Sequence, residues 1–171
     1  MNKVLISKKD IADALAPSVW DLGNNVLYEL CKNNPKHESD EAIIAKIWLI
    51  GRAYAAAVER RKNAKVTSDD FYEKDIVDAI KKSKVDEWLA NLPDQIANPW
   101  EQLSSAITAH KRLMDLFKEI TELEKRALAS KYLHFHRPDV FFLYDSRAKK
   151  ALSMVTPNIR QIADINCEES D

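Results

Sequence analysis

The chain has 171 residues, 46% apolar and 31% charged, which is enough sequence for one buried core and too apolar for a disordered chain. No apolar stretch reaches the roughly 18 to 20 residues that cross a bilayer, so we expect no membrane partner. Because 26 basic residues are balanced by 27 acidic ones, no broad positive field attracts a polyanion. DNA or RNA would have to bind a local basic patch, and the candidates are residues 59–65 and 147–150, the second with Arg147, Lys149 and Lys150.

Residue counts exclude several classes of site. Only Gly23 and Gly51 occur, so a Walker loop and a dinucleotide fingerprint, which both need glycine, are excluded, and we expect no cofactor. Cys31 and Cys167 have no companions at disulfide or zinc spacing, so we expect reduced thiols and no metal site. The first ten residues have too short an apolar core for a secretory signal, which favours a cytoplasmic protein.

The few glycines and the six prolines argue against a hairpin-rich β architecture, and the apolar residues recur with a helical period. We predict an all-α protein of about eight helices in a single globular domain over residues 1–163, followed by a polar tail over 164–171. In chain order, the predicted helices cover residues 9–16, 19–32, 39–62, 67–83, 85–91, 99–120, 122–136 and 145–154.

The segment 39–62 is the predicted central helix, because its apolar residues have the spacing of one buried face. They are Ile43, Ile44, Ile47, Trp48, Gly51, Tyr54, Ala55 and Val58. The small residues around Gly51 would let a neighbouring helix approach closely. Arg52 and Tyr54 are candidate binding residues, because polar groups among so many alanines can face a cavity; alternatively, Arg52 and Glu59 form an exposed ion pair.

The segment 99–120 is predicted to begin with a cap at Asn98 and a proline at the first helical position. We expect one apolar stripe along this helix to be buried, formed by Leu103, Ile107, His110, Leu113, Met114, Phe117 and Ile120. His110 on this stripe is either a packed residue or a ligand. Trp100 can stack on a base or a partner, or it can anchor the preceding loop in the core.

The stretch 127–152 differs from the rest of the chain, because an aromatic run at 141–144 ends on Asp145. Pro138 disfavours helical geometry at Arg137, so the helix over 122–136 ends there. We expect residues 140–144 to cross the protein as a buried extended segment. Asp145 is a good N-cap for the helix that follows.

The order of a helix, a proline-marked exit, a buried extended segment and an aspartate at a helix start resembles the carboxyl-terminal half of the helix-hairpin-helix DNA glycosylase superfamily. The resemblance covers residues from about Leu123 to Leu152. It implies a glycosylase-like carboxyl-terminal half, in which Asp145 offsets the positive charge that develops on the sugar when an N-glycosidic bond breaks.

Two features of that superfamily are not matched. Ala127 occupies the position of the lysine nucleophile of bifunctional members, and Lys125 and Lys131 lie on either side of it. The hairpin glycines that approach a DNA phosphate are replaced by "TELEKRAL". His134 or His136 can form a carboxylate–histidine pair with Asp145 for acid–base work.

Two functions follow from these residues. The first is that of a nucleic-acid-associated protein resembling a divergent base-excision glycosylase, with Asp145 as the stabilising carboxylate and Lys125, Lys131 and His136 as further catalytic candidates. The second is that of a non-catalytic helical interaction module or accessory subunit, for example of a defence or DNA-processing system. In the second, Asp145 only caps its helix and the partner is a protein.

Overall fold

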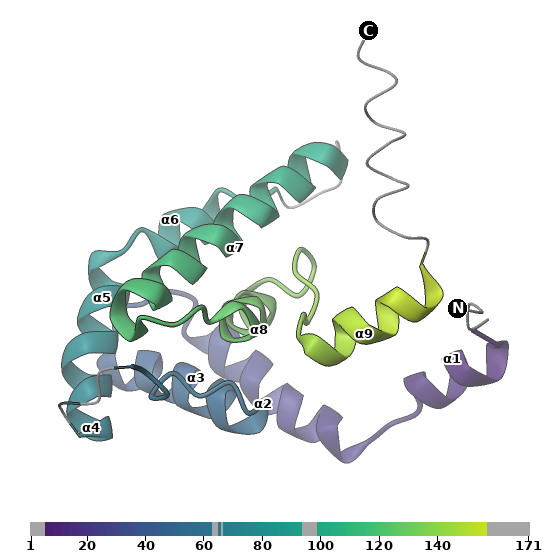
Figure 1. The fold of residues 1–171 in the computed structure, drawn as a ribbon, viewed down its shortest axis with the longest axis horizontal. Helices are drawn as coiled ribbons and strands as arrows, with labels where there is room; N and C mark the ends of the chain where they lie inside the picture. The colour runs from purple at the N-terminus through teal and green to yellow at the C-terminus, as the bar shows by residue number, and fades with distance from the viewer. Residues whose placement is uncertain (1–5, 63–64, 66, 94–98, 157–171) are drawn as a thin grey trace, which may run out of the picture. The chain divides into compact units, whose positions relative to one another are not determined.

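A computed structural model describes residues 6–62, 65, 67–93 and 99–156 of the chain (Figure 1). All regular elements within these ranges are helices, which confirms the predicted all-α class. The chain divides into two compact units, Val19–Leu143 and a smaller one that joins Met1–Ser18 to Tyr144–Asp171. The single domain over residues 1–163 stays a prediction, and the predicted tail over 164–171 lies outside the described residues.

The larger unit is built around α8 (Arg126–His136), whose side chains are buried on almost every side. Leu128, Tyr132 and Leu133 are all essentially inaccessible to solvent, so this helix forms the middle of the core. It packs against α2 (Val19–Asn33), α3 (Asp40–Ala53) and α7 (Pro99–Thr121) (Figure 1). Further helices of this unit are α4 (Ser68–Asp70), η1 (Phe71–Ile76), α5 (Val77–Lys82) and α6 (Val85–Ala90).

The predicted central helix over 39–62 is too long, because α3 ends at Ala53. Ala55 has a left-handed backbone with φ of 52°, and the N–H of Ala56 donates to the carbonyl of Gly51 at 2.8 Å. This is a Schellman ending with alanine where glycine is usual. A Cβ on Gly51 would lie 3.1 Å from the Cα of Ala57. The close neighbour of the glycine is therefore the returning chain itself, not a second helix.

The predicted buried face of this helix is only partly right. Ile43 and Ile47 are fully buried, as expected from the spacing, and Val58 is fully buried as well, although it lies beyond the end of α3. Trp48, however, is 44% exposed, and Ala55 lies on the surface after the chain has left the helix. The early end of α3 at Ala53 accounts for the exposure of Ala55 but not for that of Trp48, which lies within the helix.

The predicted helix over 67–83 is confirmed, but part of it is a π-helix. Thr67 caps the first turn, because its Oγ1 accepts from the N–H of Asp70 at 3.1 Å. Over Phe71–Ile76 the turns widen, and the N–H of Val77 donates to the carbonyl of Tyr72, five residues back. Phe71 and Ile76, and likewise Tyr72 and Val77, are five residues apart and all four are buried. An α-helix would direct the two members of each pair to different sides.

The helix predicted over 122–136 starts later than expected, at Arg126. Glu122 has a left-handed backbone with φ of 55°, which ends α7 and begins a short turn. At the other end the prediction is confirmed. Arg137, which precedes Pro138, has a non-helical backbone with φ of −140° and ψ of 72°, so α8 stops at His136.

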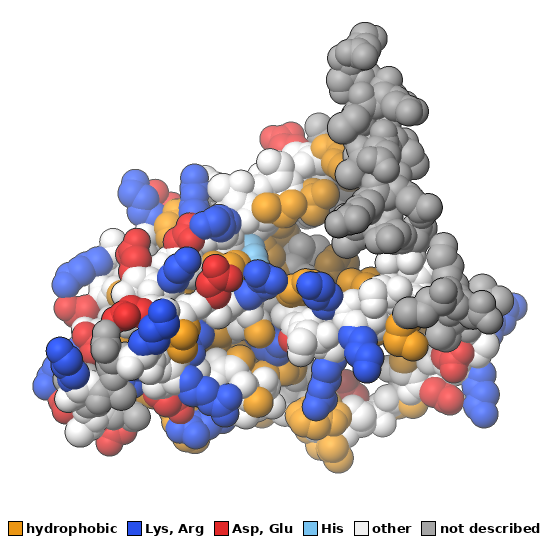
Figure 2. Space-filling model, in the orientation of Figure 1, with side chains coloured by type: hydrophobic (Ala, Val, Ile, Leu, Met, Phe, Trp, Pro, Cys, Tyr) orange, Lys and Arg blue, Asp and Glu red, His pale blue; other side chains and the backbone are white. Residues whose placement is uncertain are grey.

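The stripe predicted on α7 is buried only in its carboxyl-terminal half. Leu113 and Phe117 are fully buried, but Leu103 is 49% and Ile107 is 60% exposed. Apolar side chains accordingly gather on the surface over the amino-terminal end of α7 (Figure 2). Pro99 occupies the first helical position as predicted, whereas its expected cap, Asn98, lies outside the described residues.

The segment 140–144 begins in a turn, in which the N–H of Val140 donates to the carbonyl of Arg137 at 3.1 Å, and it is not buried along its length as predicted. Phe141 is buried and its carbonyl lies 2.6 Å from Nδ1 of His134, whereas Phe142 is 89% exposed. The hydroxyl of Ser130 donates to the carbonyl of Phe142 at 3.0 Å and helps to hold the segment on α8.

The smaller unit contains α1 (Lys8–Leu15) and α9 (Ser146–Val155), and neither helix has a buried side chain. α1 begins with a capping box, in which Ser7 and Asp10 each accept from the other's backbone N–H. Within the described ranges, no helix combines the length and the apolar character that a membrane crossing requires.

Candidate functional site

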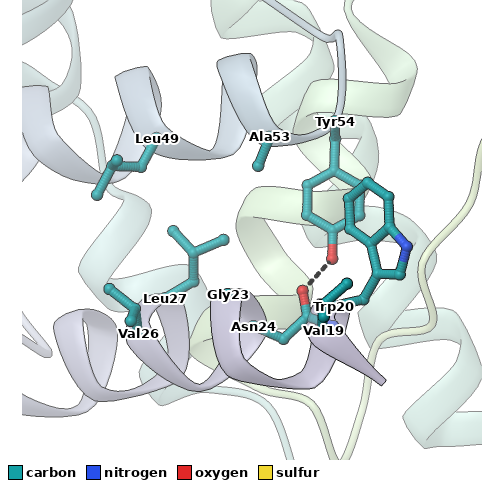
Figure 3. A pocket seen from close by; sticks show the side chains of 9 residues that line it. All are labelled: Val19, Trp20, Gly23, Asn24, Val26, Leu27, Leu49, Ala53 and Tyr54. Carbon is teal, nitrogen blue, oxygen red and sulfur yellow. Dashed lines mark hydrogen bonds between the residues drawn. The ribbon is translucent and has the colours of Figure 1, made fainter.

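An apolar groove with a volume of about 440 Å³ lies between α2 and the end of α3, within the larger unit (Figure 3). This volume is in the range of sites that bind ligands or partner side chains. From α2 the groove is lined by Val19, Trp20, Gly23, Asn24, Val26 and Leu27, and from the α3 side by Leu49, Ala53 and Tyr54. No charged side chain lines it.

The spacing of the residues on α2 explains the groove. Val19, Gly23 and Val26 are four and three residues apart, so they lie along one face of the helix. This face is exposed rather than packed, since Val19 is 78%, Trp20 is 65% and Val26 is 60% accessible. A Cβ built on Gly23 would have no atom within 4 Å, so the middle of this face is open.

A single polar pair interrupts the apolar lining. The hydroxyl of Tyr54 donates to Oδ1 of Asn24 at 2.5 Å (Figure 3). The bond fixes the orientation of the amide, and the two N–H groups on Nδ2 are the donors that this side chain can offer. Burial raises the pKa of Tyr54, so its hydroxyl stays protonated near neutral pH.

The structure separates the two candidates on the central helix. Tyr54 faces the groove, as the cavity alternative expected. Arg52 instead forms an ion pair with Glu59, with Nη2 2.6 Å from Oε1, and its guanidinium lies 5.7 Å from the ring centroid of Trp48. Glu59 also accepts from the hydroxyl of Tyr72 at 2.7 Å. Of the two alternatives for Arg52, the structure therefore shows the ion pair with Glu59.

The candidate lysines are both held inside the larger unit. Nζ of Lys125 donates to the carbonyls of Ala57, at 3.0 Å, and of Arg60. Burial lowers the pKa of Lys125. The side chain of Lys131 is buried, with Nζ 5.3 Å from the ring centroid of Tyr54. Lys125 therefore holds the loop that follows α3, and Lys131 is part of the packed core.

Asp145 caps α9, as the sequence predicts. Its Oδ1 accepts from the backbone N–H groups of Arg147 and Ala148, both at 2.9 Å. Arg147, Lys149 and Lys150 are exposed on this helix. Asp145 belongs to the smaller unit, whereas the α2–α3 groove and both candidate lysines belong to the larger one.

The histidines near the end of α8 have structural partners. The hydroxyl of Tyr28 lies 2.6 Å from Nε2 of His134, and Nδ1 binds the carbonyl of Phe141, so both ring nitrogens of His134 are used. His136 donates from Nδ1 to the carbonyl of Tyr132 at 2.8 Å. Burial lowers the pKa of His136 to about 3, so the ring is neutral near pH 7.

Beside His136 lies a buried hydrogen-bonded chain that sequence reasoning missed. Nδ1 of His37 donates to Oδ1 of Asp86 at 2.6 Å, and the hydroxyl of Tyr132 donates to Nε2 of His37 at 2.6 Å. The ring of His37 stacks on that of His136, with centroids 5.1 Å apart. Three segments far apart in the sequence supply this chain, so no short motif could have revealed it.

The other single residues that the sequence singled out have simpler surroundings. His110 is half-buried with Nε2 3.3 Å from the carbonyl of Arg126, which fits the packed alternative. Trp100 is 74% exposed at the start of α7. Cys31 is buried and free, and burial raises its thiol pKa to about 11. Among the described residues, no group of three or more His, Cys, Asp or Glu is placed to hold a metal ion.

No protein-family model, no curated protein and no solved structure matches this chain. Geometry and chemistry therefore carry the functional inference. The α2–α3 groove was missed from the sequence, although a signal was present: α2 has apolar residues on more faces than one core can cover, including Val19, Trp20, Leu22 and Val26.

Proposed function

We propose that the chain is a non-catalytic helical interaction module whose α2–α3 groove binds the apolar face of an amphipathic helix from a partner protein. The observation that supports this most is that Val19, Trp20 and Val26 are exposed on α2, where this helix forms one wall of the apolar groove. Exposed apolar surface that is both contiguous and concave is typical of interaction sites.

The energetics favour a helical partner with an uncharged contact face. Fully covering one side chain the size of Val26 is worth about 1.5–3 kcal/mol, and the groove offers several. A charge placed in this lining would lose its water and find no charged partner, so it would weaken binding. Gly23 leaves room for the partner's backbone to come close, and Asn24 can bind one polar atom of the partner.

The proposal predicts that Val26→Glu weakens binding of such helices by about tenfold or more, because it buries a charge in the contact. A displayed library of amphipathic helices, selected on the wild-type chain, would supply the ligands, and titration would give their dissociation constants. Asn25→Glu is the matched control: it adds the same charge on the next exposed position of α2, outside the groove.

The outcome against the proposal is equally specific. If the selected helices bind Val26→Glu and Asn25→Glu with the same affinity, the groove is not the contact site. A selection that yields no helix binding the wild-type chain would also reject it. Both variants should unfold at similar urea concentrations, since neither position is buried.

A second candidate function is the nucleic-acid-associated, glycosylase-like activity that the resemblance implies. One observation favours it: along the chain α8, Pro138, a non-helical segment and Asp145 at the start of α9 follow in the expected order. The exposed Arg147, Lys149 and Lys150 on α9 would supply the local basic patch.

For this second function, Asp145→Asn should leave thermal stability unchanged, because asparagine caps helices as well as aspartate, and should abolish base release from DNA. Asp145→Ala should cost about 1 kcal/mol of stability through the lost cap. Gel shifts with single- and double-stranded DNA and RNA over a salt series measure binding. Absence of retardation at low salt would exclude the nucleic-acid function.

A further inference from the structure

The exposed apolar surface of α2 extends beyond the groove that it borders. Val19, Leu22, Gly23 and Val26 follow one another at intervals of three, one and three residues, so they lie within roughly 100° of one another around the helix axis. We call these four residues the α2 face. Leu22 is 70% exposed and does not line the groove, whereas the other three do. A ligand confined to the groove would leave Leu22 in water.

The α2 face is distinct from the side of the helix that packs on the core. The buried residues of α2, Leu27 and Cys31, lie on another side. A Cβ built on Gly23 would meet no atom within 4 Å, so the space at the middle of the face is open. Leu22 therefore projects beside an empty position. Such a surface packs well on a second helix that brings a small residue opposite the large one.

The α2 face is complementary to itself when two copies of α2 lie antiparallel. A two-fold axis midway between Leu22 and Gly23 places Val19 opposite Val26 of the other copy. The same axis places Leu22 of each copy opposite Gly23 of the other. The large side chain then fills the space that the glycine leaves, and the two helices can come close together.

The charges on α2 favour the antiparallel arrangement over a parallel one. None of the four residues of the α2 face is charged, so the contact buries no unpaired charge from this face. Glu29 lies about one turn beyond Val26 at the edge of the same side, with its carboxylate 3.8 Å from Nζ of Lys32. A parallel pair would place Glu29 beside Glu29 of the other copy, whereas the antiparallel pair separates the two by about 20 Å along the axis.

The area of the α2 face indicates a weak dimer. The exposed parts of Val19, Leu22 and Val26, with that of Trp20 beside them, offer on the order of 300–400 Å² of apolar surface per copy. This is roughly half of the 800 Å² or so that each partner buries in a standard-size interface. We therefore expect association that is reversible and depends on concentration.

We propose that the α2 face is a homodimer interface, in which α2 of a second copy of this chain lies antiparallel on α2 and covers its wall of the groove. This inference rests on the proposed function, because it names the second copy as the partner whose helix the groove binds. That function requires a helix with an uncharged apolar face, and the α2 face of a second copy is one.

Sedimentation equilibrium of the full chain between about 10 µM and about 1 mM tests the proposal. The mass should rise with concentration from 19.6 kDa towards twice that value. Leu22→Glu should raise the dissociation constant at least about tenfold, because it places a charge against Gly23 of the other copy. Ile107→Glu is the matched control, since it puts the same charge in place of an exposed aliphatic side chain on α7.

Both variants should unfold at the same urea concentration as the wild type, since both positions are exposed. A wild-type chain that keeps a mass of 19.6 kDa at the highest concentration overturns the proposal. A dimer that Leu22→Glu leaves intact also overturns it, and loss of that dimer in Ile107→Glu would place the contact on α7 instead.

Mixing two variants tests the antiparallel register. Val19→Lys and Val26→Glu should each weaken the dimer by about tenfold, because each new charge faces a valine of the other copy. In a mixture, one lysine faces one glutamate and the remaining facing pair is two valines, so the mixture should associate more tightly than either variant alone. In a parallel pair both new charges would still face valines. A mixture that associates no more tightly therefore overturns the proposed arrangement.

This inference and the proposed function can fail separately. If the chain stays monomeric while selected amphipathic helices bind the groove, the second copy is not the partner and the helix-binding function stands. If the chain dimerises through the α2 face while no selected helix binds, the dimer interface stands and the helix-binding function is rejected. Neither dimerisation nor helix binding would reject both.

Discussion

Leu113→Ala should lower the free energy of unfolding by about 2–5 kcal/mol, whereas Ile107→Ala on the same helix should change it by less than about 1 kcal/mol. Leu113 is fully buried, so truncation loses its apolar contacts and leaves a cavity. Ile107 is 60% exposed and has far less to lose. Urea unfolding of the two variants, with the slope checked for two-state behaviour, measures the difference.

Both side chains have the same number of carbon atoms and lie on one helix. A difference between the two variants in the free energy of unfolding therefore reports the difference in burial. A cost for Ile107→Ala as large as that for Leu113→Ala would mean that the amino-terminal half of α7 is covered in the folded protein. In that case the exposed apolar surface over this end of α7 (Figure 2) would not exist in solution.

This pair also shows what a helical period can and cannot predict. The spacing correctly placed Leu103, Ile107, Leu113 and Phe117 on one side of one helix. It did not show how far along that side the neighbouring helices extend, and α7 at 23 residues is longer than the α6 and α8 it packs on. Burial depends on the partners, which the period of a single helix does not contain.

Local chemistry predicted the helix boundaries that a single residue controls. Pro99 begins α7, Pro138 ends α8, and the caps at Thr67 and Asp145 lie where expected. The errors fall at Ala55 and Glu122, where residues other than glycine take a left-handed backbone. No preference of alanine or glutamate signals such a turn, because a left-handed backbone is unfavourable for both residue types.

The buried polar cluster could not be predicted for a different reason. His37, Asp86 and Tyr132 come from the segment after α2, from α6 and from α8, and their spacing carries no signal. His136 was singled out from the sequence as a partner of Asp145. The structure stacks its ring on that of His37 and bonds its Nδ1 to the carbonyl of Tyr132, and the pairing with Asp145 stays a prediction.

The position of His136 leads to the second large effect, a loss of stability in mild acid. Its pKa is about 3 in the folded chain and about 6.5 when the chain is unfolded. Between these values the unfolded state binds a proton that the folded state does not, so the free energy of unfolding falls as the pH falls. At about 1.4 kcal/mol per pH unit, lowering the pH from 6.5 to 5 should cost about 2 kcal/mol through this histidine.

The pH range separates this histidine from the carboxylates. Unfolded Asp and Glu take up protons near pH 4, so carboxylates contribute little above about pH 5. Burial also lowers the pKa of His37 and His110, which adds to the loss in the same direction. Lys46 and Asp86 face the cluster, and Lys46 disfavours protonation of His136 more strongly than Asp86 favours it.

The measurement is urea unfolding at several pH values between 7.5 and 5, for the wild-type chain and for His136→Asn. Asparagine can keep a donor near Nδ1 for the carbonyl of Tyr132 but does not titrate. Its stability at pH 7.5 can differ from that of the wild type, so the slope against pH is compared, not the absolute value. We expect a clearly shallower slope for the variant, because unfolding then takes up one proton fewer. Parallel slopes would mean that His136 is already free to protonate in the folded protein, and that the stacked cluster of His37 and His136 opens to solvent.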